Sequence, residues 1–333
     1  MSTGSPGGLR FERIVVPTPY AVGPANVYVL LGDPVALFDC GPNTPAAENA
    51  LMAGLARIGV RPDQIGLMVV SHGHPDHYGL APRIQELSGS RILIGQHDLA
   101  KITDRSMLVA TGRLLLQEGM PMETLLSMGG RDASMGATRR RVHGAETLSG
   151  GERLSFGSFD LDVLHLPGHT AGHVCLWHEP TGVLFSGDTL LPDISPNPLL
   201  EPDPLDPAER RRSLVEYLRS LERLEAMPLS SVHPGHGEPI EHPGTLILKM
   251  REHHARRVEA LASMLDGDGK SAWELALELF PHLEGFDNFL AVSEVVAHID
   301  LLVEQGRATA FDRGGVTYYR ASLGGGGGIA AGG

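Results

Sequence analysis

The chain has 333 residues, of which 42% are hydrophobic and 20% are charged, so it can bury a sizeable core like an ordinary globular protein. Its apolar stretches are shorter than the ~18 residues that a membrane span needs, and residues 1–8 lack the pattern of a secretory signal. The net charge of −13 argues against a nucleic-acid backbone as the main partner, and two cysteines make no disulfide framework. We therefore expect a cytoplasmic protein that acts on a small molecule, without nucleic acid or membrane as a partner.

Strand and helix signals alternate through the first two thirds of the chain. Pro45 favours the first turn of a helix over residues 45–58, and the apolar run at 65–70 predicts a buried strand. The other expected strands are 11–18, 27–31, 35–39, 91–94, 152–156, 159–166, 173–178, 183–185 and 230–233. The other expected helices are 80–87, a helical insertion at about 97–142, and 208–224. This succession predicts two β-rich sheets flanked by helices.

The pattern changes near residue 241. Amphipathic helices are expected at 246–265, 272–280 and 289–304, before a hairpin at 308–320. Helices followed by a hairpin predict a small winged-helix-like domain over residues 241–322. Between residues 241 and 320 the chain has eight Lys or Arg and thirteen Asp or Glu, so the basic surface of a DNA-binding wing is missing. We expect this domain to cover the site or to mediate self-association into a homo-oligomer.

Both ends of the chain are expected to lie outside these domains. Residues 1–10 are small and polar and predict a flexible N-terminus, whereas residues 323–333 are rich in Gly and Ala and predict a disordered tail. The expected catalytic domain therefore covers residues 11–240.

The most informative segment is Ser71-His72-Gly73-His74-Pro75-Asp76-His77, which directly follows the predicted strand at 65–70. It puts three imidazoles and a carboxylate into one short turn at the end of a rigid element. Loops rich in these residue types also occur on protein surfaces without a metal. The spacing nevertheless favours a site for zinc, iron or manganese, since imidazole and carboxylate suit these ions.

Four other segments of the chain also place a possible ligand in a turn that follows a predicted strand. They present His169, Asp188, His236 and the acid Asp39. Glycines beside these residues let the backbone turn sharply, so that the side chains can converge. His173 follows His169 by four residues, and we expect it to support the site or the strand pairing without binding a metal.

The ordered set of ligands resembles the metallo-β-lactamase superfamily over roughly residues 11–240, and most closely its glyoxalase II-like hydrolase branch. The acidic C-terminal region is similar to that of hydrolases resembling lactamase-like protein 2. The resemblance implies an αββα sandwich, of the α/β (α+β) class, with a metal site along one edge. It implies one metal on His72, His74 and His169, and a second on Asp76, His77 and His236. Asp188 would bridge the two metals, and Asp39 would hold a ligand loop or a histidine N–H.

That division has a chemical consequence. Three protein ligands leave an open position on each metal, and a shared carboxylate can hold two dications roughly 3.5–4 Å apart. A water between them becomes a hydroxide nucleophile at neutral pH, which Asp76 would orient. Two divalent ions are therefore expected, most simply Zn²⁺, with iron or manganese as alternatives.

The expected function is hydrolysis of a thioester or another small acyl ester by this metal-bridged hydroxide. A phosphodiesterase or ribonuclease remains an alternative, because two metals suit in-line phosphoryl displacement equally well. A mono-iron dioxygenase that acts on persulfides shares the histidine motif, and β-lactam hydrolysis is less favoured. The non-enzymatic alternative is a metal-binding interaction module.

Three other features remain open at this stage. The loop at 190–200 carries three prolines and follows Asp188, so Ser195 or Asn197 could bind substrate. Residues 107–135 hold five methionines, which suit either a lid over an apolar substrate or a helical core. His253 and His254 fall within a predicted helix and are expected to face solvent.

Overall fold

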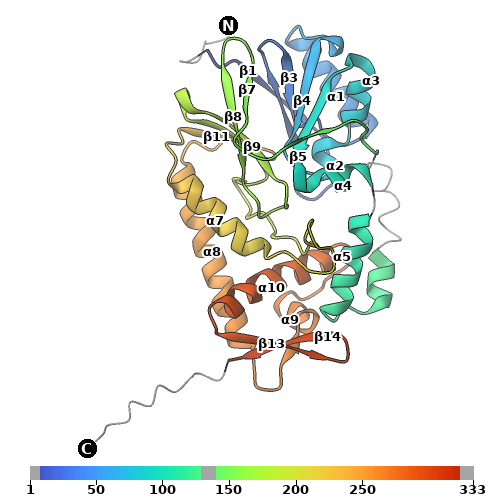
Figure 1. Ribbon diagram of the computed structural model, residues 1–333, viewed down its shortest axis with the longest axis vertical. Coiled ribbons are helices and arrows are strands. Elements are labelled where there is room, and N and C mark those ends of the chain that lie inside the picture. The colour runs from blue at the N-terminus through green and yellow to red at the C-terminus, as the bar shows by residue number, and fades with distance from the viewer. Residues whose placement is uncertain (1–7, 105, 129–139, 323–333) are drawn as a thin grey trace, which may run out of the picture.

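The protein is described by a computed structural model that covers residues 8–104, 106–128 and 140–322. Two sheets face each other in the N-terminal two thirds of the chain, and helices lie outside both of them (Figure 1). The order of elements confirms the predicted αββα sandwich. The expected N-terminal and C-terminal tails lie outside the described residues, apart from Gly8 to Arg10.

The first sheet has six strands in the order β1-β2-β3-β4-β5-β6. The strands are β1 (Phe11–Val16), β2 (Ala25–Leu30), β3 (Val35–Phe38), β4 (Ile65–Val70), β5 (Arg91–Gly95) and β6 (Glu146–Leu148). The pairs from β3 to β6 are parallel, and β1-β2 and β2-β3 are antiparallel. The sequence pattern missed β6, in which two of the three residues are exposed and no apolar run marks the strand.

Helices α1 (Pro45–Arg57) and α3 (Ala81–Ser88) cover the outer face of this sheet. Helix α1 begins at Pro45, as the sequence predicts. Thr44 Oγ1 caps the helix by accepting a hydrogen bond from the N–H of Ala47. The short helix α2 (Pro75–Tyr78) follows β4 and carries part of the metal motif.

The second sheet has five strands in the order β11-β10-β9-β8-β7. They are β7 (Arg153–Ser155), β8 (Asp160–His165), β9 (Val174–His178), β10 (Val183–Gly187) and β11 (Ser231–Pro234). Helices α7 (Ser213–Glu225) and α8 (Pro243–Met264) pack on its outer face. Buried residues of both sheets form the core between them, where the rings of Tyr28 and Phe185 lie 5.2 Å apart.

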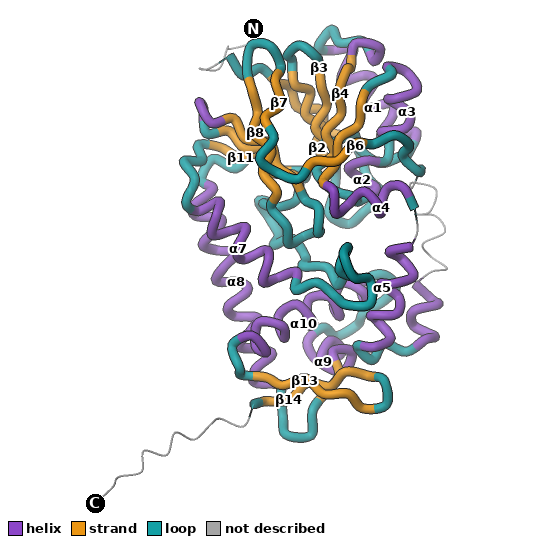
Figure 2. The backbone as a smooth tube through the Cα atoms, viewed as in Figure 1, coloured by secondary structure: helices purple, strands orange, loops and turns teal. Residues whose placement is uncertain are grey.

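The C-terminal region contains α9 (Ala272–Leu279) and α10 (Asp287–Glu304), below the sheets in Figure 2. The expected hairpin, β13 (Ala308–Arg313) and β14 (Val316–Ala321), gains a third strand, β12 (Lys270–Ser271). Its winged-helix-like assignment stays a prediction. The described residues contain no helix with the length and apolarity that crossing a bilayer requires.

The insertion after β5 packs against this C-terminal region and not only against the first sheet. Its described helices are α4 (Leu99–Thr103), α5 (Ser106–Gln117) and a stretch at 122–128, whereas residues 140–145 are not helical. Buried Leu114, Leu115 and Met120 join the hydrophobic cluster of α8, α9 and α10. The expected helix at 208–224 begins only at Ser213, because Arg210 and Arg211 are held in a loop by ion pairs with Asp300 and Glu201.

Candidate metal centre

The seven predicted ligands meet at one edge of the sandwich, where strands of both sheets end. The motif from Ser71 to His77 follows β4, Asp188 follows β10, and His236 lies two residues after β11. His169 comes from the loop between β8 and β9. The structure therefore brings together side chains that lie up to 164 residues apart, as the two facing sheets end side by side.

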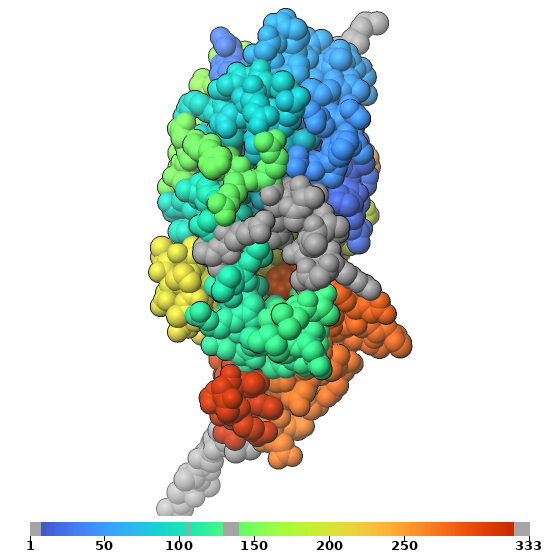
Figure 3. All heavy atoms as spheres, turned by 90° about the vertical axis from the view of Figure 1, so that its right-hand side faces the viewer, coloured from blue at the N-terminus to red at the C-terminus, as the bar shows by residue number. Residues whose placement is uncertain are grey.

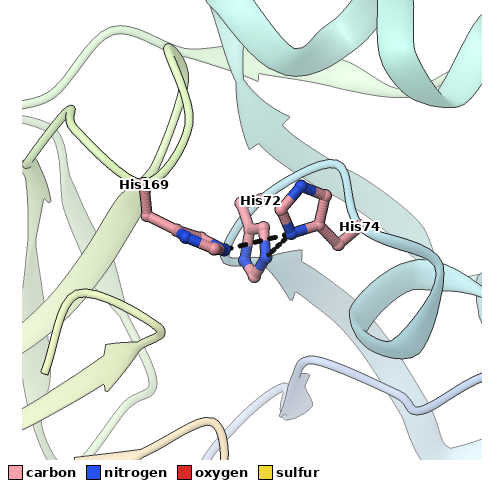
Figure 4. A group of neighbouring side chains, drawn as sticks. All are labelled: His72, His74 and His169. Atoms are coloured by element: carbon pink, nitrogen blue, oxygen red, sulfur yellow. Dashed lines mark hydrogen bonds between the residues drawn. The ribbon is translucent and has the colours of Figure 1, made fainter. Parts of the chain in front are cut away.

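The first group of ring nitrogens belongs to His72, His74 and His169 (Figure 4). His72 Nε2 lies 2.8 Å from His74 Nδ1, and His169 Nε2 lies 3.1 Å from the same atom. Three imidazole nitrogens that point at one place are the donor set of a metal site with an open position.

The second group consists of Asp76, His77 and His236. His236 Nε2 lies 3.3 Å from His77 Nε2 and 3.4 Å from Asp76 Oδ2, and His77 Nε2 lies 3.9 Å from Asp76 Oδ1. This set of two nitrogens and a carboxylate also suits a divalent transition metal.

Asp188 lies between the two groups. Its Oδ2 is 3.5 Å from His77 Nε2, 3.7 Å from His236 Nε2 and 3.8 Å from His169 Nε2. Its Oδ1 is buried and has no hydrogen-bond partner among the described residues. A buried carboxylate oxygen without a partner is costly, so this geometry fits a bridging metal ligand.

Asp39 orients two of the histidines. Its Oδ2 accepts from His77 Nδ1 at 2.8 Å and from the hydroxyl of Ser71, and Ser71 Oγ in turn lies 2.9 Å from His72 Nδ1. Its Oδ1 accepts from the N–H of Ser71. Asp39 therefore makes both kinds of contact expected of it: it holds the ligand loop and it leaves the Nε2 atoms of His72 and His77 free for a metal.

Backbone carbonyls orient the ligands on the other loops. His169 Nδ1 donates to the carbonyl of Asn197 at 3.2 Å, and His236 Nδ1 donates to that of Pro24 at 2.9 Å. Each contact fixes the tautomer with a free Nε2. His173 instead accepts from the N–H of Asp188 at 3.1 Å through Nε2, so it holds the bridging loop.

Sequence reasoning missed Asp98, which ties two ligand loops together. This buried carboxylate accepts from the N–H of Gly73 at 2.8 Å, from that of Gly172 at 3.0 Å and from the hydroxyl of Thr170 at 2.6 Å. Lys101 Nζ lies 3.0 Å from Asp98 Oδ1 and 2.5 Å from Glu201 Oε1. Burial acts to raise the pKa of Asp98, but Lys101 and the hydrogen bonds hold it well below its usual range. No local motif marks this residue, because its partners lie up to 74 positions away.

The pKa values of the histidines are shifted in opposite directions in the two ligand groups. Burial lowers the pKa of His72 and His169, so both rings are neutral and ready to donate a lone pair at neutral pH. Burial also acts to lower the pKa of His77, but the carboxylates of Asp188 and Asp39 outweigh it and raise that pKa well above its ordinary value. In the absence of metal, His77 thus supplies the positive charge that the acids require.

Glycine is required where the loops approach most closely. A Cβ on Gly235 would run into Asp188 Oδ1 and would lie 2.8 Å from His77 Cε1. A Cβ on Gly187, where φ is +48°, would lie 2.7 Å from that of Ser71. The glycines beside the ligands therefore allow the loops to close around the site.

Two residues predicted as substrate contacts use their side chains elsewhere. Ser195 Oγ bonds to His254 Nε2 at 2.9 Å, and the Asn197 amide donates to the carbonyl of Leu290 at 3.0 Å. Their role in substrate binding stays a prediction. The expectation that His254 faces solvent is wrong, since this ring is 1% exposed and lies between α7, α8 and α10.

A cavity of about 370 Å³ opens beside the first group of nitrogens. His74 and Tyr78 line one end, and Met107 and Met128 of the insertion line its wall. Met120 is instead buried in the C-terminal core, as the helical-core alternative expects, whereas the role of a lid over a substrate stays a prediction. Met135 lies outside the described residues.

An αββα sandwich with nitrogen and oxygen donors at the shared edge of its sheets defines the class of metallo-hydrolase folds. The family described as "Metallo-beta-lactamase superfamily" matches residues 20–236. The chain belongs to this superfamily, which confirms the resemblance found in its motifs.

Three relatives illustrate the similarity. "Probable metallo-hydrolase YqjP" of Bacillus subtilis (strain 168) is 33% identical over 316 residues, which cover 92% of this chain and 96% of that protein. The crystal structure of a metallo-beta-lactamase family protein from Thermus thermophilus has a TM-score of 0.78 at 34% identity, over 95% of this chain and 99% of that one. "Hydroxyacylglutathione hydrolase" of Methylococcus capsulatus is 38% identical over 91 residues, covering 27% of this chain and 31% of that protein.

Proposed function

We propose that the protein is a dinuclear metal-dependent hydrolase that cleaves a thioester or another small acyl ester. The observation that carries the proposal is the position of Asp188 Oδ2, within 3.8 Å of ring nitrogens from both ligand groups. A single-metal site would use only one group and would leave the three side chains of the other group without a metal to bind. Zinc suits this donor set best, with iron or manganese as alternatives.

In this proposal His72, His74 and His169 hold one ion, Asp76, His77 and His236 hold the other, and Asp188 is shared. Bound divalent ions would supply Lewis acidity toward the acyl carbonyl and toward a water molecule.

The chain's own residues supply orientation and proton handling. Burial acts to raise the pKa of Asp76, but His77 and His236 lower it below its ordinary value, so Asp76 is a carboxylate at neutral pH. It can then accept a hydrogen bond from the attacking water and direct the oxygen lone pair at the substrate. Asp39 and the carbonyls of Asn197 and Pro24 keep the surrounding rings in place meanwhile.

The choice of an acyl substrate rests on two supports. One relative is a hydroxyacylglutathione hydrolase, and hydroxyacylglutathione is a thioester. The net charge of −13 also disfavours a polyanionic phosphodiester or RNA substrate. A mono-iron dioxygenase requires only one group of ligands, and a non-catalytic module requires no open positions. We further propose that the protein works in the cytoplasm on a small molecule, and that its C-terminal region contributes to self-association.

The test combines metal content with a substrate panel. Elemental analysis of the purified protein is expected to give two metal ions per chain. Thioesters, lactones, β-lactams and phosphodiesters are then compared, and Asp76→Ala is expected to reduce ester or thioester turnover by roughly 10²-fold or more. Phosphodiester turnover that requires Asp76, without any ester turnover, would overturn the acyl proposal.

A further inference from the structure

The cavity beside His74 is apolar over most of its wall. It is bounded by the insertion, by the segment at 199–201 and by the start of α10. The apolar side chains among its lining residues are Ile102, Met107, Leu108, Leu115, Leu125, Met128, Leu199, Leu200, Phe286 and Phe289. Figure 3 shows a hollow beside the green insertion, with orange-red atoms of the C-terminal region visible inside it.

Some of these apolar groups are exposed to solvent although they lie beside a core. Phe286 is 45% exposed and Leu108 is 47% exposed, and both face the cavity from different segments. Apolar side chains that gather around a concave site next to catalytic groups indicate an apolar ligand, because they gain free energy only when water leaves them.

Most charged groups at the cavity are already paired. Lys101 is neutralised by Asp98 and Glu201, and Arg140 Nη2 lies 2.8 Å from Glu86 Oε1. The hydroxyl of Thr111 donates to the carbonyl of Met107. The exception is Arg141, which lines the cavity and is exposed, so one guanidinium can meet an anionic group of the substrate where the cavity meets solvent. The paired groups leave few free donors for a phosphate or a sugar elsewhere in the lining.

We infer that this cavity binds the acyl chain of the substrate, and that the enzyme prefers esters or thioesters of medium-length fatty acids over acetyl compounds. The inference rests on the proposed function. The acyl carbonyl lies at the His74 end, and the hydrocarbon chain extends between α5 and α10. Water adds to the acyl carbon, the C–S or C–O bond breaks, and a carboxylic acid and a thiol or alcohol leave, with the proton of the water passing to the leaving group.

Gly112 offers a way to shorten the cavity. It lies on α5 in the cavity wall, and a Cβ there meets only Leu125 Cδ2, at an ordinary contact distance of 3.7 Å. Gly112→Leu therefore extends a side chain into the space without a clash against the backbone. Val109→Leu is the matched control, since Val109 is on the same helix, is 71% exposed and is not part of the cavity lining.

The experiment measures kcat/KM for acetyl, butyryl, hexanoyl, octanoyl and decanoyl thioesters with one common thiol. We expect a rise of about fourfold per added methylene until the cavity is filled. Gly112→Leu is expected to lose at least about tenfold on the decanoyl compound while acetyl turnover stays within about twofold, and Val109→Leu is expected to match the wild type.

The outcomes separate the inference from the proposed function. Thioester hydrolysis with no dependence on acyl length, or with a dependence on the length of the thiol instead, would overturn the inference and leave the hydrolase standing. If no ester is hydrolysed, the proposed function fails, and calorimetry with decanoate still tests the cavity. Decanoate binding that Gly112→Leu weakens and Val109→Leu does not would support it, whereas equal binding by all three proteins, or none, would overturn it.

Discussion

The strand-end centre around Asp188 and the group formed by His253, His254 and Glu294 on α8 and α10 both bring imidazoles and a carboxylate within 4.8 Å of one another. The use of their ring nitrogens differs. In the strand-end centre His77, His169 and His236 each donate a hydrogen bond from Nδ1 to a fixed acceptor, and their Nε2 atoms point toward a shared position.

In the C-terminal group the nitrogens are already engaged. His254 bonds to Ser195 Oγ through Nε2 and to His298 Nε2 through Nδ1, at 2.9 and 3.0 Å. Arg257 Nε lies 3.4 Å from Glu294 Oε1. The only carboxylate of this group is therefore already paired with a guanidinium and does not offer its charge to a metal. The comparison teaches that ring nitrogens turned toward one point, beside a buried carboxylate oxygen that lacks a hydrogen bond, distinguish a metal centre from a polar core, and the density of histidines does not.

The largest expected effect follows removal of the shared ligand. Asp188→Ala is expected to lose at least one metal ion per chain and to lower ester hydrolysis about 10³-fold or more, because both ligand groups lose their common anion. Elemental analysis and kcat/KM check this. Glu294→Gln serves as the control in the C-terminal group and is expected to retain full metal content. If Asp188→Ala retains two metal ions per chain, Asp188 is not the shared ligand and the contrast between the two groups does not hold.

Asp98→Ala tests how the metal centre is held together. The change removes the acceptor of two backbone N–H groups and one hydroxyl, and it leaves Lys101 with Glu201 alone. We expect a loss of about 3 kcal/mol in the free energy of unfolding of the metal-free protein, measured by urea denaturation. Asp63→Ala is the matched control, because Asp63 is exposed and pairs with Arg61. This substitution is expected to change the free energy of unfolding by less than about 1 kcal/mol.

The C-terminal group is expected to respond to acid. Burial lowers the pKa of both His254 and His298 to about 3, below the ordinary value of 6.5. At these two rings the unfolded chain binds more protons between pH 6.5 and about 3, so their contribution to stability falls as the pH falls through this window. Burial raises the pKa of Glu294 to about 7, so this carboxyl offsets part of the loss between pH 7 and 4.5. His253, Glu294 and Arg257 are the charged or titratable groups around the pair.

Substitution of one ring isolates that contribution. Between pH 7 and pH 5 we expect the wild type to lose about 2 kcal/mol more stability than His298→Gln, whose amide does not titrate. Urea denaturation of the metal-free proteins at the two pH values measures the difference. An equal loss in both proteins would show that His298 is not kept neutral by burial.

The smallest effect is expected at the edge of the same group. The side chain of His253 is 40% exposed and lies 4.0 Å from Glu294 Oε1. His253→Ala is expected to change the free energy of unfolding by less than about 1 kcal/mol and to leave the metal content unchanged. A lost metal ion in this variant would mean that the C-terminal group binds one after all.

The sequence predicted most of the strands and the αββα order because their signals are local. An apolar run marks β4, and Pro45 marks the start of α1. It also singled out the seven candidate ligands, since each stands in a Gly-rich turn after or before a strand, and the family resemblance implied their division between two metals. It failed at β6, where no apolar run marks the strand, and at the start of α7, which begins only at Ser213 because ion pairs hold the preceding arginines in a loop.

By itself, therefore, the sequence determined which side chains can donate to a metal and which runs of residues form strands and helices, because both depend on neighbours within a few positions. Only the tertiary structure decided that Asp98 joins two ligand loops, that His254 is buried, and that α5 and α10 enclose a cavity beside His74. Each of these depends on partners from distant segments, and the packing of two sheets and a helical cluster determines which of those partners meet.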